Sequence, residues 1–343
     1  MMRVGIVGLG IGQLHLRAWW KVEGANTVIV ADSDVERARA TGEARNVQWV
    51  TSLDEVLAAG VDTIDLCTPP EMHEAQILQC LEAGVHVICE KPLVGSIDAC
   101  ERLRDAALAA AESSGALLMP IMQYRFGAGA AQARALIDAG LTGRLYTASA
   151  ATWWRRDRAY YDEAAWRSTR AGALGGTLVN HALHIHDLLT WIGGQVVAVN
   201  GQISTRVNDV ETEDCAVAIA RTIDGGLMSM NVTLGAAVES SRLTWNFEHV
   251  SIESTTDPYH PARRPWKFDY RDDATAAAAA RVMAASMSQV GEQYVGQFQA
   301  FVDGIEHGRL PVSLDDAQDA IALAAAWYTS AETGSWVDLQ QTR

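Results

Sequence analysis

The chain has 343 residues, which gives room for two domains and a large hydrophobic core. Hydrophobic residues make up 49% of it and aromatic residues 7%, a composition typical of globular proteins. The 42 acidic residues outnumber the 27 basic ones, for a net charge of −15. This excess disfavours nucleic acids and anionic membranes as partners, because both bind basic patches.

The sequence contains no segment typical of membrane insertion or export. No apolar run approaches the length of a membrane span, and the glycines of residues 1–12 favour a buried strand and turn over a signal peptide. The five cysteines are odd in number and form no Cys-x-x-Cys pair. We therefore expect reduced, mostly buried thiols and a cytoplasmic protein.

The first third of the chain alternates between short apolar runs and helical stretches. The apolar runs are residues 3–9, 27–33, 63–70, 86–92 and 116–122, and the helical stretches between them include 34–45, 71–84 and 96–114. Continuous apolar strands separated by helices indicate a parallel sheet covered on both faces. About six strands before residue 123 predict a doubly wound, dinucleotide-binding Rossmann domain over residues 1–122.

The pattern changes after Gln123. A helix over residues 128–140 is followed by segments rich in β-branched and aromatic residues, at 145–154, 196–207, 215–223, 226–234 and 242–254. These segments are too close together for crossover helices, so we predict an α+β domain with a large, mostly antiparallel open sheet. We assign residues 123–343 to this domain, which would bind substrate and form oligomer contacts.

Several helices interrupt or follow these strands. We predict helices at about 173–192, 288–307 and 315–332, and a short last strand in 335–339. The helix at about 315–332 is a candidate to pack back on the first domain. The Ala-rich stretch 272–288 is compatible with a helix or a mobile connection, and we favour a structural segment without function.

A glycine-rich turn follows the first strand. Gly8, Gly10 and Gly12 flank Ile11, whereas the dinucleotide fingerprint would place its last glycine at position 13, which is Gln13. The turn is therefore expected to be one residue tighter, with Gly12 at the helix start. A structural turn without a ligand is the alternative, but the strand before it and the helix after it favour a nucleotide site.

Asp32 is the second part of this predicted nucleotide site. It ends the second strand, twenty residues after Gly12 (32 − 12), where a carboxylate can bind an adenosine ribose and repels a 2′-phosphate. Ser33 follows where an arginine could have bound that phosphate. We therefore predict NAD rather than NADP as the cofactor, although Arg37 and Arg39 lie nearby; a helix-capping aspartate is the structural alternative.

Three longer stretches resemble the Gfo/Idh/MocA family, which includes glucose–fructose oxidoreductase and inositol dehydrogenase. Residues 65–93 contain Thr68-Pro69 with His73, followed by a Glu90-Lys91-Pro92 tripeptide after the next strand. Residues 175–194 and 294–339 are similar to the family's histidine-containing helix and its C-terminal helices. The resemblance implies a Rossmann domain, a nicotinamide cofactor and a carbohydrate substrate.

The resemblance also implies roles for individual residues. Lys91 matches an active-site lysine beside the nicotinamide, and His184 matches a histidine acid/base. Asn180 stands where many members have aspartate, which excludes a proton relay through that position and leaves only hydrogen bonding. The residues that the family would place near the cofactor are Thr68, Pro69, His73, Glu90, Lys91, Gln123, Trp166 and Arg167.

These residue types suit the oxidation of a secondary alcohol. Histidine has a pKa near neutrality, so His184 can take the hydroxyl proton while Lys91 stabilises the developing alkoxide. We assign Lys91, His184 and Asn180 to catalysis. A solvated surface charge is the structural alternative for Lys91, but its place directly after a buried strand favours function.

Residues 153–167 combine aromatic rings with arginines and acids, so they are a candidate substrate wall; a loop or a dimer contact is an equal alternative. The predicted substrate-binding residues are Lys91, Arg125, Trp153, Tyr161, Asn180, His181 and His184.

Residues 181, 184 and 186 are all histidines, which raises the question of a metal site. A helical residue turns by about 100°, so Asn180 and His184 would share a face while His186 lies on nearly the opposite side. Such histidines do not converge on one ion, and hydride transfer requires none. We predict no metal site and assign His186 to packing or to the surface.

The sequence thus predicts an NAD-dependent dehydrogenase of a sugar, polyol or sugar derivative. Two alternatives stay open: a glycoside-cleaving enzyme that uses NAD for transient oxidation, and a non-catalytic regulator that binds NAD and a sugar. We expect a small-molecule carbohydrate as partner, and a homodimer or homotetramer formed through the second sheet.

Overall fold

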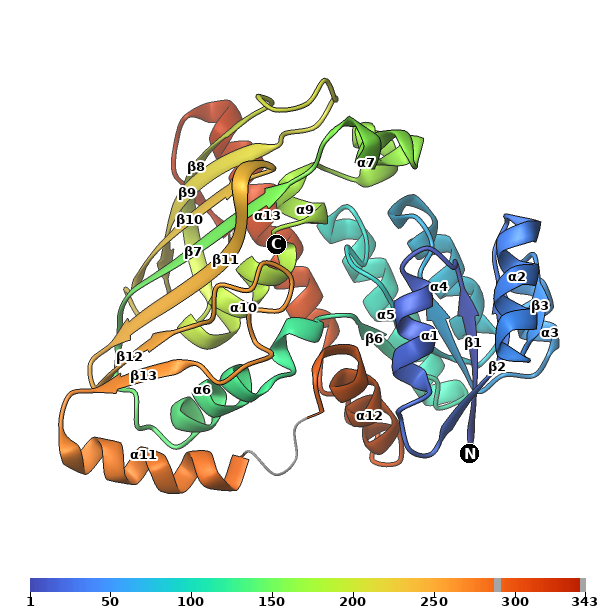
Figure 1. The fold of residues 1–343 in the computed structure, drawn as a ribbon, viewed down its shortest axis with the longest axis horizontal. Coiled ribbons are helices and arrows are strands. Elements are labelled where there is room, and N and C mark those ends of the chain that lie inside the picture. The colour runs from blue at the N-terminus through green and yellow to red at the C-terminus, as the bar shows by residue number, and fades with distance from the viewer. Residues whose placement is uncertain (287–290, 340–343) are drawn as a thin grey trace. The chain divides into compact units, whose positions relative to one another are not determined.

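The computed structural model describes residues 1–286 and 291–339 and contains two compact units (Figure 1). The first unit comprises residues 1–122 and 294–318, and the second comprises residues 123–293 and 319–343. The sequence analysis placed residues 294–318 with the second domain, whereas the structure groups them with the first.

A six-stranded parallel sheet forms the centre of the first unit, in the order β3-β2-β1-β4-β5-β6. Its strands are β1 (Met2–Val7), β2 (Ala25–Ala31), β3 (Gln48–Val50), β4 (Thr63–Leu66), β5 (His86–Cys89) and β6 (Leu118–Pro120). The strand order reverses between β1 and β4, and open α/β sheets bind ligands at the carboxyl ends beside such a reversal. The predicted doubly wound sheet is confirmed.

Helices connect these strands. They are α1 (Gly12–Trp19), α2 (Val35–Arg45), α3 (Leu53–Ala58), η1 (Pro70–Met72), α4 (His73–Glu82) and α5 (Ile97–Ser113). The side chains of Asp34, Ser52 and Ser96 each accept a backbone N–H in the first turn of the helix that follows them. These caps fix where α2, α3 and α5 begin.

Helix α12 (Gln293–Ile305) attaches to this sheet through a buried amide. Gln297 Oε1 accepts the Met122 N–H at 3.0 Å, and its Nε2 donates to the Pro120 carbonyl at 2.8 Å. The ring of Phe298 stacks on Trp19 with centroids 4.4 Å apart. These contacts explain why α12 belongs to the first unit. Its expected start near residue 288 lies outside the described residues.

The second unit is built on an eight-stranded sheet in the order β13-β12-β11-β7-β10-β9-β8-β14. Its strands are β7 (Leu145–Arg155), β8 (Val196–Ser204), β9 (Cys215–Thr222), β10 (Leu227–Thr233), β11 (Gly235–Phe247), β12 (Val250–Glu253), β13 (Lys267–Tyr270) and β14 (Val337–Asp338). The β7–β10 pair is parallel and the other pairs are antiparallel. This arrangement confirms the predicted, mostly antiparallel second sheet.

The helices of this unit are mostly short. They are η2 (Gln123–Arg125), α6 (Ala128–Asp138), α7 (Arg158–Asp162), η3 (Ala165–Ser168), α8 (Arg170–Ala173), α9 (Thr177–Asn180), α10 (Leu183–Gly193), α11 (Asp273–Ser286) and the part of α13 (Leu314–Thr333) from residue 319 on. The Ala-rich stretch thus forms a helix, α11. None of the described helices is long and apolar enough to cross a membrane.

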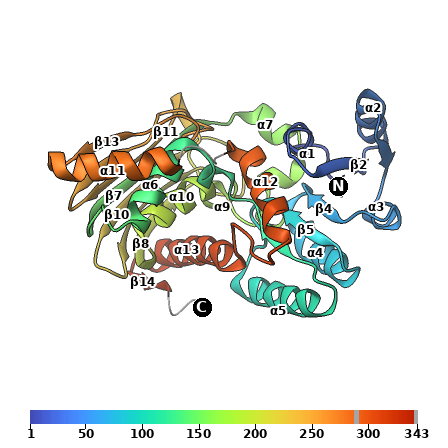
Figure 2. The same cartoon turned by 90° about the horizontal axis from the view of Figure 1, so that it is seen from below.

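One face of the second sheet is packed and the other is open. Trp245 Nε1 donates to the Leu189 carbonyl of α10 at 3.0 Å, and α10 and α13 lie on the same side of this sheet in both views (Figures 1 and 2). On the opposite face, Val217 and Ile219 of β9 are 54% and 51% exposed. The period-two alternation of the sequence produces this contrast.

The continuous helix predicted for residues 173–192 is wrong. The chain forms three helices there, α8, α9 and α10, separated at 174–176 and at 181–182. Leu174 adopts φ +56°, and Gly175 and Gly176 follow it, so the backbone leaves the helical conformation at this point. Asn180 therefore ends one helix, and His184 lies in the first turn of the next.

Candidate functional site

The turn after β1 has the features of a phosphate-binding turn. Gly8 has φ +90°, and a Cβ there would lie 2.6 Å from the Cys67 carbonyl oxygen, so only glycine fits. Helix α1 begins at Gly12, as the sequence predicted, and its N-cap Ile11 supplies no side-chain hydrogen bond. No heavy atom outside the turn lies within 4 Å of a Cβ built on Gly10. The N–H groups at this helix end suit a pyrophosphate.

Asp32 ends β2 beside this turn. Its Oδ2 accepts the Leu9 N–H at 2.7 Å, and its Oδ1 accepts the Asp34 N–H at 2.9 Å. Arg37 Nη1 lies 3.2 Å from Asp32 Oδ2, and Arg37 Nη2 lies 3.2 Å from Asp34 Oδ2. Ser33 is exposed. Both cations that the sequence places near a 2′-phosphate position are thus paired with carboxylates, Arg37 with Asp32 and Asp34, and Arg39 with Glu36.

His73 joins the loops that follow β4 and β5. Its Nε2 lies 2.9 Å from the Thr68 carbonyl oxygen, and its Nδ1 lies 2.8 Å from the Pro92 carbonyl oxygen. The side chain is fully buried. His73 therefore contacts the backbone of the two loops that carry Thr68, Pro69 and Lys91.

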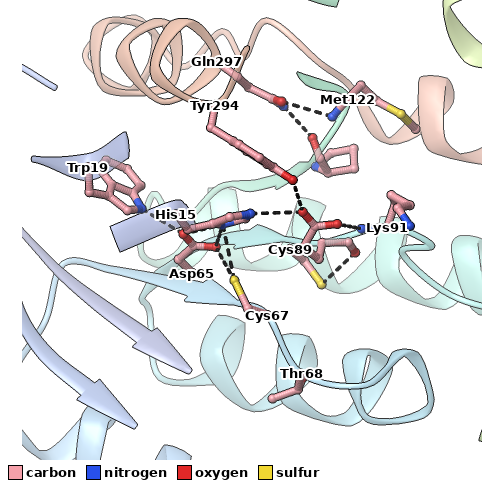
Figure 3. A network of polar contacts seen from close by, with 12 residues as sticks. His15, Trp19, Asp65, Cys67, Thr68, Cys89, Lys91, Met122, Tyr294 and Gln297 are labelled. Atoms are coloured by element: carbon pink, nitrogen blue, oxygen red, sulfur yellow. Dashed lines mark hydrogen bonds and ion pairs between the residues drawn. The ribbon is translucent and has the colours of Figure 1, made fainter. Parts of the chain in front are cut away.

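Lys91 is the second residue after β5 and lies at the carboxyl end of that strand. Its backbone N–H donates to Oε2 of Glu90 at 2.9 Å. The Glu90 side chain points inward, where Oε1 meets His15 Nε2 at 3.0 Å and the Tyr294 hydroxyl at 3.0 Å (Figure 3). Glu90 therefore supports the segment that carries Lys91.

Sequence reasoning missed His15 and Tyr294. One signal was available: His15 lies four residues before Trp19 in α1, and that spacing places both on the buried face of the helix. A buried histidine requires polar partners. Those partners, Asp65 and Glu90, come from distant parts of the chain, and no sequence pattern identifies them.

A pocket in the second unit brings several predicted substrate residues together. It has about 240 Å³ of empty space, part of it open to solvent. Its lining residues are Tyr160, Tyr161, Trp166, Arg167, Gly175, Gly176, Thr177, Asn180, His181 and Thr212. The guanidinium of Arg167 lies 4.3 Å from the Tyr160 ring centroid. Aromatic faces with a few polar groups are typical of small-molecule sites.

Asn180 is held in this pocket as a hydrogen-bond donor. Its Nδ2 donates to the carbonyls of Ala173 at 2.8 Å, Gly175 at 3.0 Å and Gly176 at 3.4 Å. These carbonyls belong to the irregular backbone between α8 and α9. An aspartate could not make these bonds, because a carboxylate only accepts. The backbone carbonyls around Asn180 therefore require a hydrogen-bond donor at this position, which an amide supplies.

Glu213 supports the same segment from the opposite direction. Its Oε1 accepts the Leu178 N–H at 3.0 Å and the Tyr328 hydroxyl at 2.8 Å, and Tyr328 in turn accepts the Gly176 N–H at 3.1 Å. Burial raises the pKa of the Glu213 carboxyl. Sequence reasoning did not single out either residue.

The three histidines contact different aromatic rings. His184 lies against Tyr124 with centroids 5.1 Å apart, and His181 lies 5.6 Å from Tyr160. His186 stacks on Trp327 at 5.3 Å, and burial lowers its pKa to about 3. His186 is thus a packing residue.

The candidate metal-binding group in the described residues lies elsewhere. His15, Asp65 and Cys67 each offer a ligand atom, and these atoms all lie within 4.8 Å of one another. They also contact one another directly, with Cys67 Sγ 3.3 Å from His15 Nδ1 and 3.5 Å from Asp65 Oδ1.

Arg125 and Trp153, two of the predicted substrate-binding residues, both pair with other side chains of the second unit. Arg125 is buried and donates to Asp187 through Nε at 2.9 Å and Nη2 at 2.5 Å, so its charge is already balanced. Trp153 is 46% exposed and donates to Asn231 Oδ1 at 2.5 Å. Because the side chains of a strand alternate between its two faces, the neighbouring Trp154 points the other way. Its ring centroid lies 6.1 Å from that of His181. Gln123 is buried at the start of η2.

The donor role of Asn180 can be tested by Asn180→Asp. The substitution places a carboxylate against backbone carbonyl oxygens, so we expect the free energy of unfolding to fall by roughly 2–4 kcal/mol in denaturant titration. Asn200→Asp adds the same charge at a part-buried position of β8 and serves as the control. An Asn180→Asp variant as stable as the control would contradict the donor role.

The protein is expected to need no metal at His15, Asp65 and Cys67, because these side chains hydrogen-bond to one another. Dialysis against a chelator should leave the thermal unfolding midpoint unchanged, and elemental analysis of the purified protein should show no stoichiometric zinc. A drop in the midpoint that added zinc reverses would show that the cluster holds an ion.

The chain matches two family models. Residues 2–119 match the oxidoreductase family with an NAD-binding Rossmann fold, named GFO_IDH_MocA, and residues 130–253 match the GFO/IDH/MocA C-terminal domain. Together they cover the candidate residues of both units except Gln123 and Arg125, which lie between the two matched ranges.

Relatives and solved structures agree with these matches. Inositol 2-dehydrogenase 2 of Paenarthrobacter aurescens is 26% identical over 93% of this chain and 92% of its own. D-glucoside 3-dehydrogenase of Escherichia coli is 23% identical over 98% and 97%. The crystal structure of the WlbA dehydrogenase of Bordetella pertussis with NADH and UDP-GlcNAcA superimposes with a TM-score of 0.83, at 26% identity over 98% of each chain. The chain therefore belongs to the Gfo/Idh/MocA family of oxidoreductases, and its first unit carries the family's NAD-binding Rossmann fold.

Proposed function

We propose that the protein oxidises a secondary hydroxyl of a sugar, polyol or sugar derivative by hydride transfer to NAD. The observation that carries the proposal is the position of Lys91, two residues after the end of β5, at the carboxyl edge of an NAD-binding sheet where ligands bind. Relatives that act on inositol and on glucosides support the substrate class.

His184 is the proposed acid/base. It lies in the first turn of α10, is 4% exposed and packs against Tyr124. An imidazole in such a place can take a proton from a substrate hydroxyl, since histidine changes charge near neutral pH. We assign to His184 the removal of the proton from the hydroxyl that is oxidised.

Lys91 is proposed to act on the same hydroxyl. Its ammonium would stabilise the negative charge that develops on the oxygen as the proton leaves. Asn180, held by backbone carbonyls, contributes a fixed position in the pocket wall rather than a proton. In this scheme His184 is the base and Lys91 supplies the positive charge.

NAD, when bound, accepts the hydride, and the chain's own residues bind and orient it. The residues suited to hold it in the first unit are Gly8, Gly10, Ile11, Gly12, Asp32, Thr68 and Pro69. The turn fits a pyrophosphate because Gly10 leaves open space and α1 has an uncapped N-terminus. Trp166 and Arg167 of the second unit stay proposals for further contacts.

The pocket of the second unit is proposed to bind the carbohydrate. Tyr161, Trp166 and His181 supply ring surfaces, and Thr177 and Thr212 lie beside them. Two described polar atoms in or beside this region, Thr177 Oγ1 and Glu213 Oε2, are buried without a hydrogen-bond partner among the described residues. The pocket therefore offers both apolar contact and hydrogen bonding, as a sugar requires.

A second copy of the chain is proposed to cover the open face of the second sheet. Besides Val217 and Ile219, that face exposes Leu227 and Trp153, at 55% and 46%. An exposed apolar sheet face is typical of an oligomer contact. All five cysteines are free thiols, which supports a reducing compartment such as the cytoplasm.

A substrate screen tests the activity. Inositol, alkyl glucosides and UDP-GlcNAcA are each incubated with NAD⁺ or NADP⁺, and reduced nicotinamide is followed by absorbance. We expect stoichiometric NADH with at least one of them and a kcat/KM roughly tenfold or more higher with NAD⁺ than with NADP⁺, because Asp32 and Asp34 hold Arg37. Asp32→Ser should lower the ratio of the kcat/KM with NAD⁺ to the kcat/KM with NADP⁺. Product formed without NADH would contradict the proposed reaction.

Substitution of the two proposed catalytic residues gives a second test. Lys91→Met and His184→Ala should each lower kcat by roughly 100-fold or more while the Kd for NAD⁺, measured by calorimetry, stays near the wild-type value. His186→Ala is the control: it removes a buried ring stacked on Trp327, so it should lower the melting temperature but not kcat. A Lys91→Met variant with weak NAD⁺ binding and normal kcat would assign the lysine to the cofactor instead.

A further inference from the structure

A buried histidine links three elements of the first unit. His15 of α1 is 0% exposed, and both of its ring nitrogens face carboxylates. Nδ1 lies 2.9 Å and 3.0 Å from the two Asp65 oxygens at β4, and Nε2 lies 3.0 Å from Glu90 Oε1 beyond β5 (Figure 3). The imidazole is therefore the bridge between two acids that are themselves buried.

The geometry requires a protonated ring. A neutral imidazole donates from one nitrogen only and would direct a lone pair at one of the two carboxylates. Burial by itself lowers the pKa of His15, but the charges and hydrogen bonds of Asp65 and Cys67 together outweigh it, so the pKa is raised well above the ordinary value. The titratable groups that face the ring are Asp65, Cys67, Glu90 and Tyr294.

Glu90 connects this charge to the proposed catalytic segment. Its Oε1 is held by His15 and by the Tyr294 hydroxyl, each at 3.0 Å, and its Oε2 accepts the Lys91 N–H at 2.9 Å. One carboxylate thus joins the buried cation to the lysine backbone. Trp19 Nε1 fixes the other end of the network by donating to Asp65 at 2.8 Å.

We propose that His15 is a positioning residue that fixes Lys91 by holding the Glu90 carboxylate in place. The proposal rests on the proposed function, because it takes Lys91 as the group that acts on the substrate oxygen. Without the imidazolium, Asp65 and Glu90 would be buried without the positive charge that lies between them, and one of them would take up a proton or turn toward water. Either change removes the acceptor of the Lys91 N–H and lets the segment move.

Amide hydrogen exchange tests the link without substrate or cofactor. In His15→Gln, exchange of the Lys91 amide should accelerate by about tenfold or more, because the bond to Glu90 Oε2 is weakened. His86→Gln is the matched control, since His86 lies at the opposite end of β5. Unchanged Lys91 exchange in a folded His15→Gln protein would overturn the proposal.

A second variant covers the case in which His15→Gln does not fold. Tyr294→Phe retains the ring that packs on His15, with centroids 4.3 Å apart, and removes only the hydroxyl that donates to Glu90. Faster Lys91 exchange in this variant supports the network, and wild-type exchange counts against it.

A double-substitution cycle separates positioning from general support. His15→Gln should lower kcat by roughly tenfold with little change in the KM for NAD⁺, and adding it to Lys91→Met should lower kcat by no more than about twofold further. If the two substitutions lower kcat by factors that multiply in the double variant, His15 does not act through Lys91. If Lys91→Met alone leaves kcat unchanged, the proposed function fails, whatever His15 does.

The pH dependence of stability gives an independent readout. A histidine whose folded pKa lies above its unfolded value stabilises the fold most below the unfolded pKa, and this stabilisation is lost as pH rises through the folded pKa. The melting temperature of the wild type should therefore exceed that of His15→Gln by more in mildly acidic than in alkaline buffer. A difference that does not vary with pH, or that grows toward alkaline pH, would contradict a charged His15.

Discussion

The close approach of the loops after β1 and β4 is the constraint on which the first unit depends. Gly8 lies so near the Cys67 carbonyl that a Cβ would be 2.6 Å from its oxygen. This contact sets the height of the glycine turn above the sheet edge, where Leu9 donates to Asp32 and α1 begins. Parallel strands end at the same edge, so Thr68 and Lys91 follow β4 and β5 there as well. The chemistry of this unit is therefore a consequence of strand order.

Charged side chains are buried beneath that edge of the sheet. Their burial costs free energy, but it also holds the surrounding elements in place. Three ionisable side chains, His15, Asp65 and Glu90, come from α1, β4 and the end of β5. A charge with partners on two sides resists displacement, because moving it would leave a carboxylate desolvated and unpaired. The network thus resists small shifts of α1 relative to β5 more strongly than apolar packing does, since apolar contacts carry no directional requirement.

The sequence predicted those features that depend on local pattern. Apolar runs gave the parallel sheet, the glycine spacing gave the start of α1 at Gly12, and the three family stretches gave the family. The remaining features depend on tertiary contacts. Periodicity predicted one helix through residues 181–182 and did not register the backbone break that follows Leu174. Alternation shows that Trp153 and Trp154 face opposite ways, but not which of them faces the pocket.

Hydrogen-bond direction gives a structural reason for an amide at Asn180. The backbone between α8 and α9 presents carbonyls of Ala173, Gly175 and Gly176 to this side chain, so the position requires a donor. Glu213 has the opposite role, because its carboxylate accepts hydrogen bonds from the Leu178 N–H at the start of α9 and from the Tyr328 hydroxyl. An amide and a carboxylate thus divide the donors and acceptors of one irregular segment. Exchanging either for the other chemical type would leave a buried polar group unpaired, whatever role the residue has in catalysis.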